Sequence, residues 1–286
     1  MPDIHIGTSG WNYKSFVTRL YPPGTPKIKY LETYSTKLLT VVSERKLTKT
    51  VISSKARNFI VLRIQALKIS PYGRNDKKRG FRSGTTVELN ASFYRSFPQS
   101  TWESWYRRTP LDFLWAVKAP RFFTHIKRLD VLQDSIDRFW NDIKPLKEKM
   151  GAALFQLPPS LKFDRDLLTG FLAMQPQDTK ISLEARHPSW HEPQIWDILK
   201  KRNVAWVVSD TADRHPMSLK VTADFAYVRL HGAHELYHGL YGEELLRKWM
   251  GTIRDWGIET FIYFDNTDDG SAATDALLLK KMLEEK

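Results

Sequence analysis

Short runs of β-branched and other apolar residues recur along the chain, and most are followed by a longer stretch with apolar residues every three or four positions. The first pattern is typical of buried β-strands and the second of amphipathic α-helices. The short runs predict strands at 4–8, 86–90, 113–118, 152–156, 181–185, 204–209, 225–230 and 260–264. The longer stretches predict helices at 27–38, 100–108, 131–149, 165–174, 193–202, 243–256 and 272–285.

The alternation of strands and helices predicts an α/β fold with a parallel sheet. Nearly continuous apolar strands belong to a sheet that is buried on both faces, and eight of them favour a closed (β/α)8 TIM barrel. An open, doubly wound sheet is the alternative, but no glycine-rich phosphate loop follows a predicted strand. The stretch 210–224 has no helical pattern, so one helix is expected to be missing between strands six and seven. We therefore expect a single TIM-barrel domain over 1–286.

Composition is that of a globular protein from a reducing compartment. Hydrophobic residues make up 42% and aromatic residues 13% of the 286 residues, which is ample for a core. Cysteine is absent, and this excludes disulfides, thiolate metal ligands and a cysteine nucleophile. The N-terminus has no signal-peptide pattern, and no segment approaches the roughly 20 apolar residues of a membrane span. We expect a cytoplasmic protein with no membrane partner.

The formal charge of +12 is concentrated in one block. Residues 41–85 contain twelve lysines and arginines but only two acids, so the rest of the chain is close to neutral. A surface that binds nucleic acid spreads its cations over a functional face, whereas a single basic block is typical of a loop, tail or insertion. Nucleic acid is therefore a less favoured partner, and 41–85 is predicted to be a basic, partly disordered insertion.

Polar residues stand at the end of every predicted strand, which is where a TIM barrel carries its active site. Candidate catalytic residues are acids and histidines that transfer protons, namely Glu88, Glu184, His187 and His231. Candidate substrate-binding residues supply charge, hydrogen bonds or stacking surfaces, namely Trp11, Asn90, Tyr94, Lys118, Gln156, Arg186, Trp190, Asp210, Arg229, Tyr263 and Asn266.

These candidates leave several functions open. Glu88 and Glu184 are either an acid and base pair of the glycosidase kind or carboxylates held by arginines, Glu184 by Arg186 or Arg229. The cations at four strand ends favour capture of a phosphate, a carboxylate or a polar sugar, because buried cations need anions from the protein or from a ligand.

A divalent metal is a further alternative, because His187, His231, Glu184 and Asp210 carry the donor atoms that zinc and manganese use. No tight ligand spacing such as H-E-x-x-H occurs. We therefore assign no metal ligand, and a metal cofactor is not favoured.

Several segments resemble, in order, the motifs of the YecE-like family, also called domain of unknown function 72. They are IHIGTSGWNY, YPPGTPKIKYLETYS, TVELNASFYRSFPQSTWESWYRRTP, WAVKAPRFFTHIKRL, GAALFQLPPSLKFD, LEARHPSW and YVRLHG. The resemblance covers nearly all of the chain except 41–85 and implies a TIM barrel without a settled activity. It also implies that 41–85 interrupts a helix-to-strand connection at the barrel bottom, as an accessory loop or as a gene-model artefact. Asp265 departs from the family pattern of two successive asparagines, which changes the charge of the rim.

The sequence thus predicts a TIM barrel with a polar arginine, glutamate and histidine pocket for a small sugar-like or phosphorylated ligand. A hydrolase or an isomerase is the enzymatic form of this hypothesis. A metal-dependent phosphodiesterase of the endonuclease IV type and a non-catalytic binding protein are the alternatives.

Overall fold

The computed structural model describes residues 2–40 and 82–284. The prediction of partial disorder for the basic insertion therefore falls mostly on residues outside the described ranges. Within those ranges no helix is long and apolar enough to cross a membrane.

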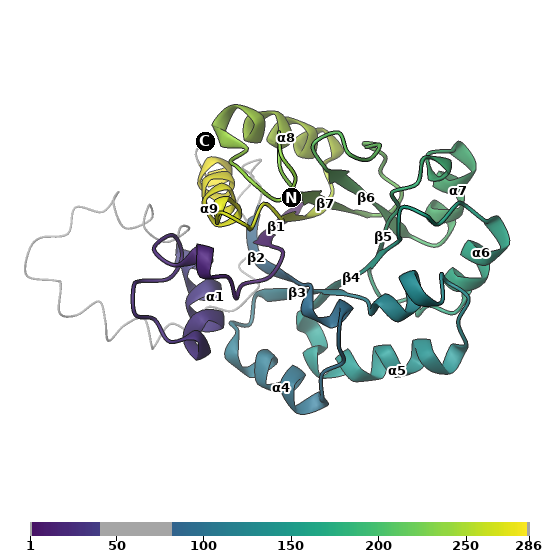
Figure 1. Cartoon of the computed structure of the whole chain (residues 1–286), viewed down its shortest axis with the longest axis horizontal. Coiled ribbons are helices and arrows are strands. Elements are labelled where there is room, and N and C mark those ends of the chain that lie inside the picture. Colours follow the sequence, from purple (N-terminus) through teal and green to yellow (C-terminus); the bar gives the residue numbers. More distant parts are fainter. Residues whose placement is uncertain (1, 41–81, 285–286) are drawn as a thin grey trace, which may run out of the picture.

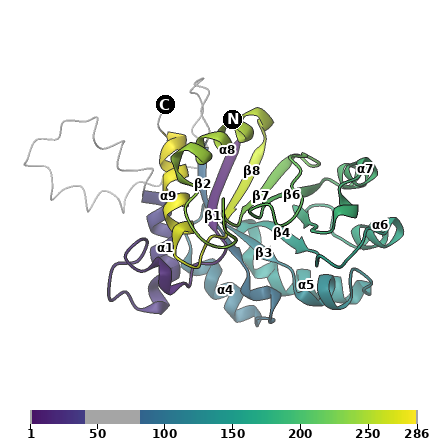
Figure 2. The same ribbon diagram turned by 45° about the horizontal axis from the view of Figure 1, so that its top comes forward.

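Within the described residues, eight parallel strands close into a barrel in chain order, and β1 pairs with both β2 and β8. The strands are β1 (Asp3–Thr8), β2 (Arg82–Leu89), β3 (Phe113–Lys118), β4 (Met150–Gln156), β5 (Ile181–Glu184), β6 (Val204–Asp210), β7 (Phe225–Leu230) and β8 (Glu259–Phe264). Figure 2 shows β1 and β8 side by side along their length. The predicted (β/α)8 TIM barrel is confirmed.

Helices surround the barrel in chain order (Figure 1). They are α1 (Tyr30–Thr40), α4 (Gln99–Arg108), α5 (Gln133–Ile143), α6 (Arg165–Ala173), α7 (Pro193–Lys201), α8 (Gly242–Trp256) and α9 (Ser271–Glu284). Residues 211–224 contain no helix, so the predicted missing helix between β6 and β7 is confirmed. The predicted helix over 131–149 was too long, because α5 ends at Ile143 and a 3-10 helix with Pro145 in its first turn follows at Lys144–Lys149.

Alternation along the strands gives the barrel two cores. One set of apolar side chains packs outward against the helices, as Leu183 does. The other set fills the barrel interior and includes Leu154, Val207, Tyr227 and Tyr263. Because successive side chains point to opposite faces of a sheet, the residue two positions after each of these lies on the same interior face, one layer nearer the C-terminal end.

Strands β1 and β2 approach closely. A Cβ atom at Gly7 would lie only 2.0 Å from the Thr86 carbonyl oxygen, so this position requires glycine. The pairing begins at Asp3 and Arg82, which corrects the predicted start of the second strand at Thr86 and assigns 82–85 to β2 instead of the insertion. Helix α1 ends and β2 begins at the N-terminal end of the barrel, opposite the strand ends that carry the predicted site.

Candidate functional site

Eight polar side chains form a ring at the C-terminal end of the barrel, one from each strand or from the residue that follows it. Each lies two positions after an interior residue of its strand, as Arg229 does after Tyr227. We call this set the polar ring, and it consists of Ser9, Glu88, Lys118, Gln156, Glu184, Ser209, Arg229 and Asp265. Four buried charged members, Glu88, Glu184, Arg229 and Asp265, are joined by hydrogen bonds. Each of these four charges therefore has a partner of opposite charge within the protein.

Arg229 is the centre of the polar ring and is only 1% exposed. Its Nη2 and Nε donate to the two oxygens of Glu88 at 2.8 and 3.0 Å. Its Nη1 donates to Glu184 Oε2 at 2.8 Å, and Nη2 also donates to Asp265 Oδ2 at 3.1 Å. Burial alone would lower the pKa of the guanidinium, but the neighbouring carboxylates raise it well above its usual value. One buried cation thus joins carboxylates from three strand ends.

Each glutamate of the polar ring is saturated with donors. Glu88 accepts hydrogen bonds from Ser9 Oγ and from Tyr227 OH, each at 2.7 Å. Glu184 Oε1 accepts from Gln156 Nε2 and from Arg186 Nε, each at 3.0 Å.

Charge pairing keeps Glu184 ionised. Burial alone would raise the pKa of the Glu184 carboxyl, yet Arg229 and Arg186 hold it well below its usual range. The arginine-held interpretation of this carboxylate matches the geometry.

His231 lies directly beside this network and is fully buried. Its Nε2 is 3.1 Å from Arg229 Nη1, and its Nδ1 is 2.8 Å from Asp265 Oδ2. Because a guanidinium N–H can only donate, Nε2 acts as the acceptor and the ring proton is assigned to Nδ1. Nδ1 lies close to the carboxylate but does not meet the geometry of a hydrogen bond. Burial would raise the pKa of Asp265, but Arg229 and His231 lower it.

Lys118 differs from every other member of the polar ring. It is 8% exposed, and its Nζ lies 4.4 Å from the centre of the Phe93 ring. Among the described residues, no carboxylate pairs with this ammonium group and no oxygen accepts a hydrogen bond from it. Burial and the charge of Arg229 lower the pKa of Lys118 to about 8.

Lys118 and further cations act together on His125 at the mouth of the barrel. A single π-helical turn at Phe122–Ile126 follows β3 and carries His125, with Arg121 as its N-cap. Burial lowers the pKa of His125, and the charges of Lys118, Arg121 and Arg186 lower it further. His125 is therefore biased toward its neutral form in a strongly positive region.

A hollow of about 300 Å³ lies beside the polar ring and contains two of the predicted binding residues, Trp11 and Asn90. Asp210 lines a separate hollow of about 320 Å³ in the loop after β6. Burial raises the pKa of Asp210.

Other predicted site residues lie outside the polar ring. Tyr94 is 73% exposed, and Trp190 is buried with its Nε1 donating to the Leu161 carbonyl at 2.8 Å. His187 caps a 3-10 turn by accepting from the Ser189 amide.

Two more of these residues take structural roles around β8. Tyr263 lies inside the barrel against Thr86 Oγ1 at 2.8 Å, one layer below the ring. Asn266 donates to Asp275, whose carboxylate also accepts from the first amide of α8.

The four proposed metal donors are not brought together. His231 and Glu184 are 4.0 Å apart. Asp210 accepts a hydrogen bond from the His231 amide at its backbone carbonyl, at 2.9 Å, but its carboxylate accepts from the Ala212 amide. The His187 ring pairs with Ser189 instead. Over 2–40 and 82–284, no group of three or more histidine, aspartate or glutamate side chains is arranged to hold a metal ion.

Sequence reasoning missed Tyr227 and the structural importance of Asp265. Tyr227 precedes Arg229 by two positions in β7, so both side chains enter the barrel and both donate to Glu88. The two-residue period of the strand is the signal that identifies Tyr227.

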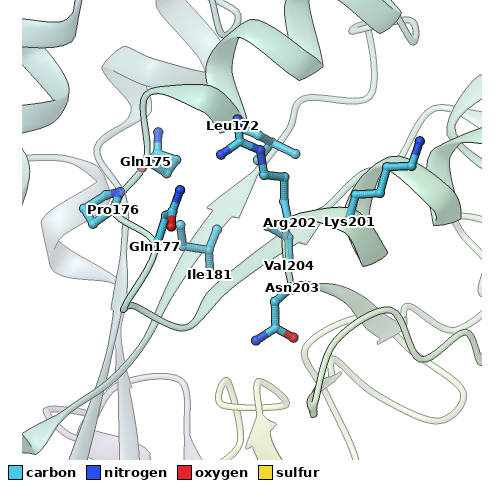
Figure 3. Close-up of a pocket in the computed structure, with 9 residues that line it drawn as sticks. All are labelled: Leu172, Gln175, Pro176, Gln177, Ile181, Lys201, Arg202, Asn203 and Val204. Carbon is cyan, nitrogen blue, oxygen red and sulfur yellow. The ribbon is translucent and has the colours of Figure 1, made fainter.

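Another hollow, of about 540 Å³, lies at the opposite end of the barrel, where β5 and β6 begin at Ile181 and Val204. Two cations, Lys201 and Arg202, line it, and Figure 3 shows that Lys201 extends away from most of the other labelled side chains. Because this hollow has no buried ionic group in its wall, the polar ring is the better candidate site.

Comparison with known proteins finds a family model described as "Protein of unknown function DUF72", which matches residues 5–45 and 81–286. The UPF0759 protein YunF of Bacillus subtilis is 26% identical over 233 residues, covering 69% of this chain and 82% of that protein. The crystal structure of a DUF72 family protein from Thermotoga maritima is 25% identical, with a TM-score of 0.75 and 99% of each chain covered. One from Enterococcus faecalis has 18% identity and a TM-score of 0.63 over 70% of this chain and 85% of that chain. Residues 46–80 lie between the two matched segments.

Proposed function

The chain belongs to the DUF72 family of proteins of unknown function, and from the site itself we propose that the polar ring binds a small sugar-like or phosphorylated ligand. The anionic group of the ligand contacts Lys118 and Arg186. Glu88, Glu184 and Arg229 position these groups from beneath and are shielded from the ligand by burial.

The unpartnered ammonium of Lys118 is the observation that supports this proposal. Two other lysines are also buried, and both are satisfied by the protein. Lys149 Nζ donates to the carbonyl oxygens of Tyr106 and Thr109 at 2.6 and 2.7 Å, and Lys280 Nζ donates to Thr85 Oγ1 at 2.8 Å. Lys118 Nζ has no hydrogen-bond acceptor among the described residues, and keeping a charge at this largely buried position is costly to the folded protein. An anionic ligand would supply the missing acceptors.

Arg186 and Arg121 act on His125 together with Lys118, so the three cations contribute to one positive region. Arg186 uses its Nε to hold Glu184, which fixes the guanidinium plane while its side chain stays partly exposed. Arg121 is exposed at the start of the π-helical turn. Guanidinium groups suit the bidentate recognition of phosphate.

Calorimetric titration with inorganic phosphate, and with sulfate as a second anion, tests the proposal. Lys118→Met should weaken anion binding by about 10- to 100-fold, the equivalent of one charge-assisted hydrogen bond of roughly 1.5 to 3 kcal/mol. Lys280→Met is the matched control, because Lys280 is also buried and its pKa is also lowered to about 8, but it lies on α9 outside the barrel. Equal effects of the two variants, or no anion binding by the unmodified protein, would contradict the proposal.

Proton transfer at the bound ligand is a second candidate function, which the pKa of Lys118 of about 8 favours. A base with a pKa near the working pH is suited to remove a proton beside a carbonyl group, as an isomerase requires. Guanidinium groups are not deprotonated in proteins, so the anion is still held when Lys118 is neutral.

Deuterium exchange separates this isomerase hypothesis from simple binding. Sugar phosphates incubated with the protein in D₂O should exchange a C–H next to the carbonyl, and nuclear magnetic resonance reports the exchange. Exchange that is lost in Lys118→Met but retained in Lys280→Met supports the proton transfer. Binding without exchange supports a non-catalytic binding protein. Glu184 holds Arg186 and Arg229, so unchanged exchange in Glu184→Gln would contradict a positioning role for that carboxylate.

A further inference from the structure

The hollow of about 300 Å³ beside the polar ring is a separate feature of the barrel mouth. It lies between the loop after β1 and the short 3-10 helix Ala91–Phe93 after β2, and Trp105 of α4 lies in its wall. Its volume is at the lower end of the range for small-molecule sites, which is about 300 to 1,000 Å³. The space fits one ring with its substituents.

Two polar groups of this hollow lack partners among the described residues. Asn90 Oδ1 is buried and accepts no hydrogen bond. The guanidinium of Arg95 lies 4.7 Å from the centre of the Phe97 ring and makes no described ion pair or hydrogen bond. Buried amide oxygens are normally paired, so Asn90 Oδ1 is able to accept a hydrogen bond from a ligand in the hollow. The guanidinium of Arg95 supplies hydrogen-bond donors, which complement the acceptor at Asn90.

The apolar part of the wall is built from aromatic rings. Trp11 packs edge to face against Trp105 at 5.6 Å, and Phe97 packs against Trp105 at 5.0 Å. Trp11 and Trp105 also pack on the buried Trp115, which holds both indoles in fixed positions. A rigid aromatic wall beside one unpaired acceptor and one unpaired donor suits a ring with an apolar face and several hydroxyl groups.

The 3-10 helix Ala91–Phe93 joins this hollow to the proposed anion site. Ala91 lines the hollow, whereas Phe93 carries the ammonium of Lys118 over its ring. Between them, Ser92 Oγ donates to the Lys118 carbonyl at 2.6 Å. The two sites are therefore on either side of a three-residue segment that is bonded directly to β3.

We propose that the hollow at Trp11, Asn90 and Arg95 is a subsite for a monosaccharide ring, with a ring hydroxyl donating to Asn90 Oδ1. The proposal rests on the proposed function for one point only, that an anionic group of the same ligand reaches Lys118. The substrate class is then a sugar phosphate whose ring and anion are recognised on opposite sides of Ala91–Phe93.

Titration calorimetry with inorganic phosphate, glucose, glucose 6-phosphate and ribose 5-phosphate tests the subsite. At least one sugar phosphate should bind ten or more times more tightly than inorganic phosphate. Asn90→Ala removes the acceptor, and Ala91→Trp fills the hollow from an exposed position. Both variants should abolish the gain from the sugar ring and leave phosphate binding unchanged. Asn141→Ala, at an exposed position of α5, is the control and should keep the gain.

The outcomes separate this subsite from the anion site. If neither sugar phosphate binds more tightly than phosphate, or if the gain survives both variants, the ring subsite is overturned while phosphate binding keeps the proposed function. If glucose binds in an Asn90-dependent manner but phosphate does not bind, the subsite stands and the anion site fails. Circular dichroism of each variant distinguishes loss of binding from loss of fold.

Discussion

Replacing Lys118 by methionine should stabilise the protein while it removes anion binding. In the folded chain the pKa of Lys118 is lowered from 10.5 to about 8, chiefly by burial. A shift of this size corresponds to roughly 3 kcal/mol of unfavourable free energy for the charged form at neutral pH. Methionine has a similar length without the charge, so Lys118→Met should raise the free energy of unfolding at pH 7 by up to about 3 kcal/mol.

The sign of the pH dependence follows from the same shift. Below pH 8 the lysine is charged in both the folded and the unfolded state, so its full cost is present. Between pH 8 and 10.5 the folded protein loses this proton first, and the unfolded chain holds more protons. The contribution of Lys118 to stability therefore becomes less unfavourable as pH rises through this window. Lys118→Met should lack this component and gain less stability than the unmodified protein on going from pH 7 to pH 10.

Urea denaturation at pH 7 and pH 10 measures both effects, and phosphate titration of the same samples measures binding. We expect Lys118→Met to be more stable at pH 7 and to bind anions more weakly than the unmodified protein. This combination is typical of a residue that serves function at a cost in stability. A variant that is less stable at pH 7, or that binds phosphate as the unmodified protein does, would refute the reasoning.

Three further changes have definite expectations. Affinity for sulfate, whose charge is constant, should fall about tenfold between pH 7 and pH 9 as Lys118 loses its proton, and a flat calorimetric profile would contradict this. Arg229→Met leaves three carboxylates without their shared cation and should lower the free energy of unfolding by about 3 to 5 kcal/mol; an unchanged urea midpoint would show that the polar ring is not a stabilised network. Deletion of 46–80 should preserve the circular dichroism spectrum and phosphate binding while it removes most salt-sensitive adsorption to DNA, and loss of fold would show that the segment is structural.

The fold was predictable because the apolar runs of buried parallel strands are nearly continuous. Strands β3 and β7 begin and end at the predicted residues. The start of β2 was missed because Arg82, Ser83 and Gly84 have no apolar pattern, and pairing with β1 places them in the barrel. The end of α5 was predicted six residues too late, at 149 instead of Ile143. The apolar pattern continues past Ile143, but a 3-10 helix with Pro145 in its first turn begins there.

The site was predictable as a set of strand ends but not as a set of contacts. Polar residues after apolar strands indicated Glu88, Glu184 and Arg229. Their pairing joins residues 141 and 45 positions apart, a separation that no local spacing encodes. Trp190 also follows a strand, yet its indole belongs to the core. A position at the end of a strand thus identifies a residue as a candidate for the site. Whether its side chain points into the barrel then decides whether it belongs to the polar ring.

A crystal structure of the protein grown with selenate tests the central claim most directly, because anomalous scattering from selenium locates the anion without ambiguity. We predict selenate within hydrogen-bonding distance of Lys118 Nζ and of the Arg186 guanidinium in the unmodified protein. The same experiment on Lys118→Met should show this position empty. Selenate bound only elsewhere on the surface, with Lys118 still without a partner, would contradict the assignment of the polar ring as an anion-binding site.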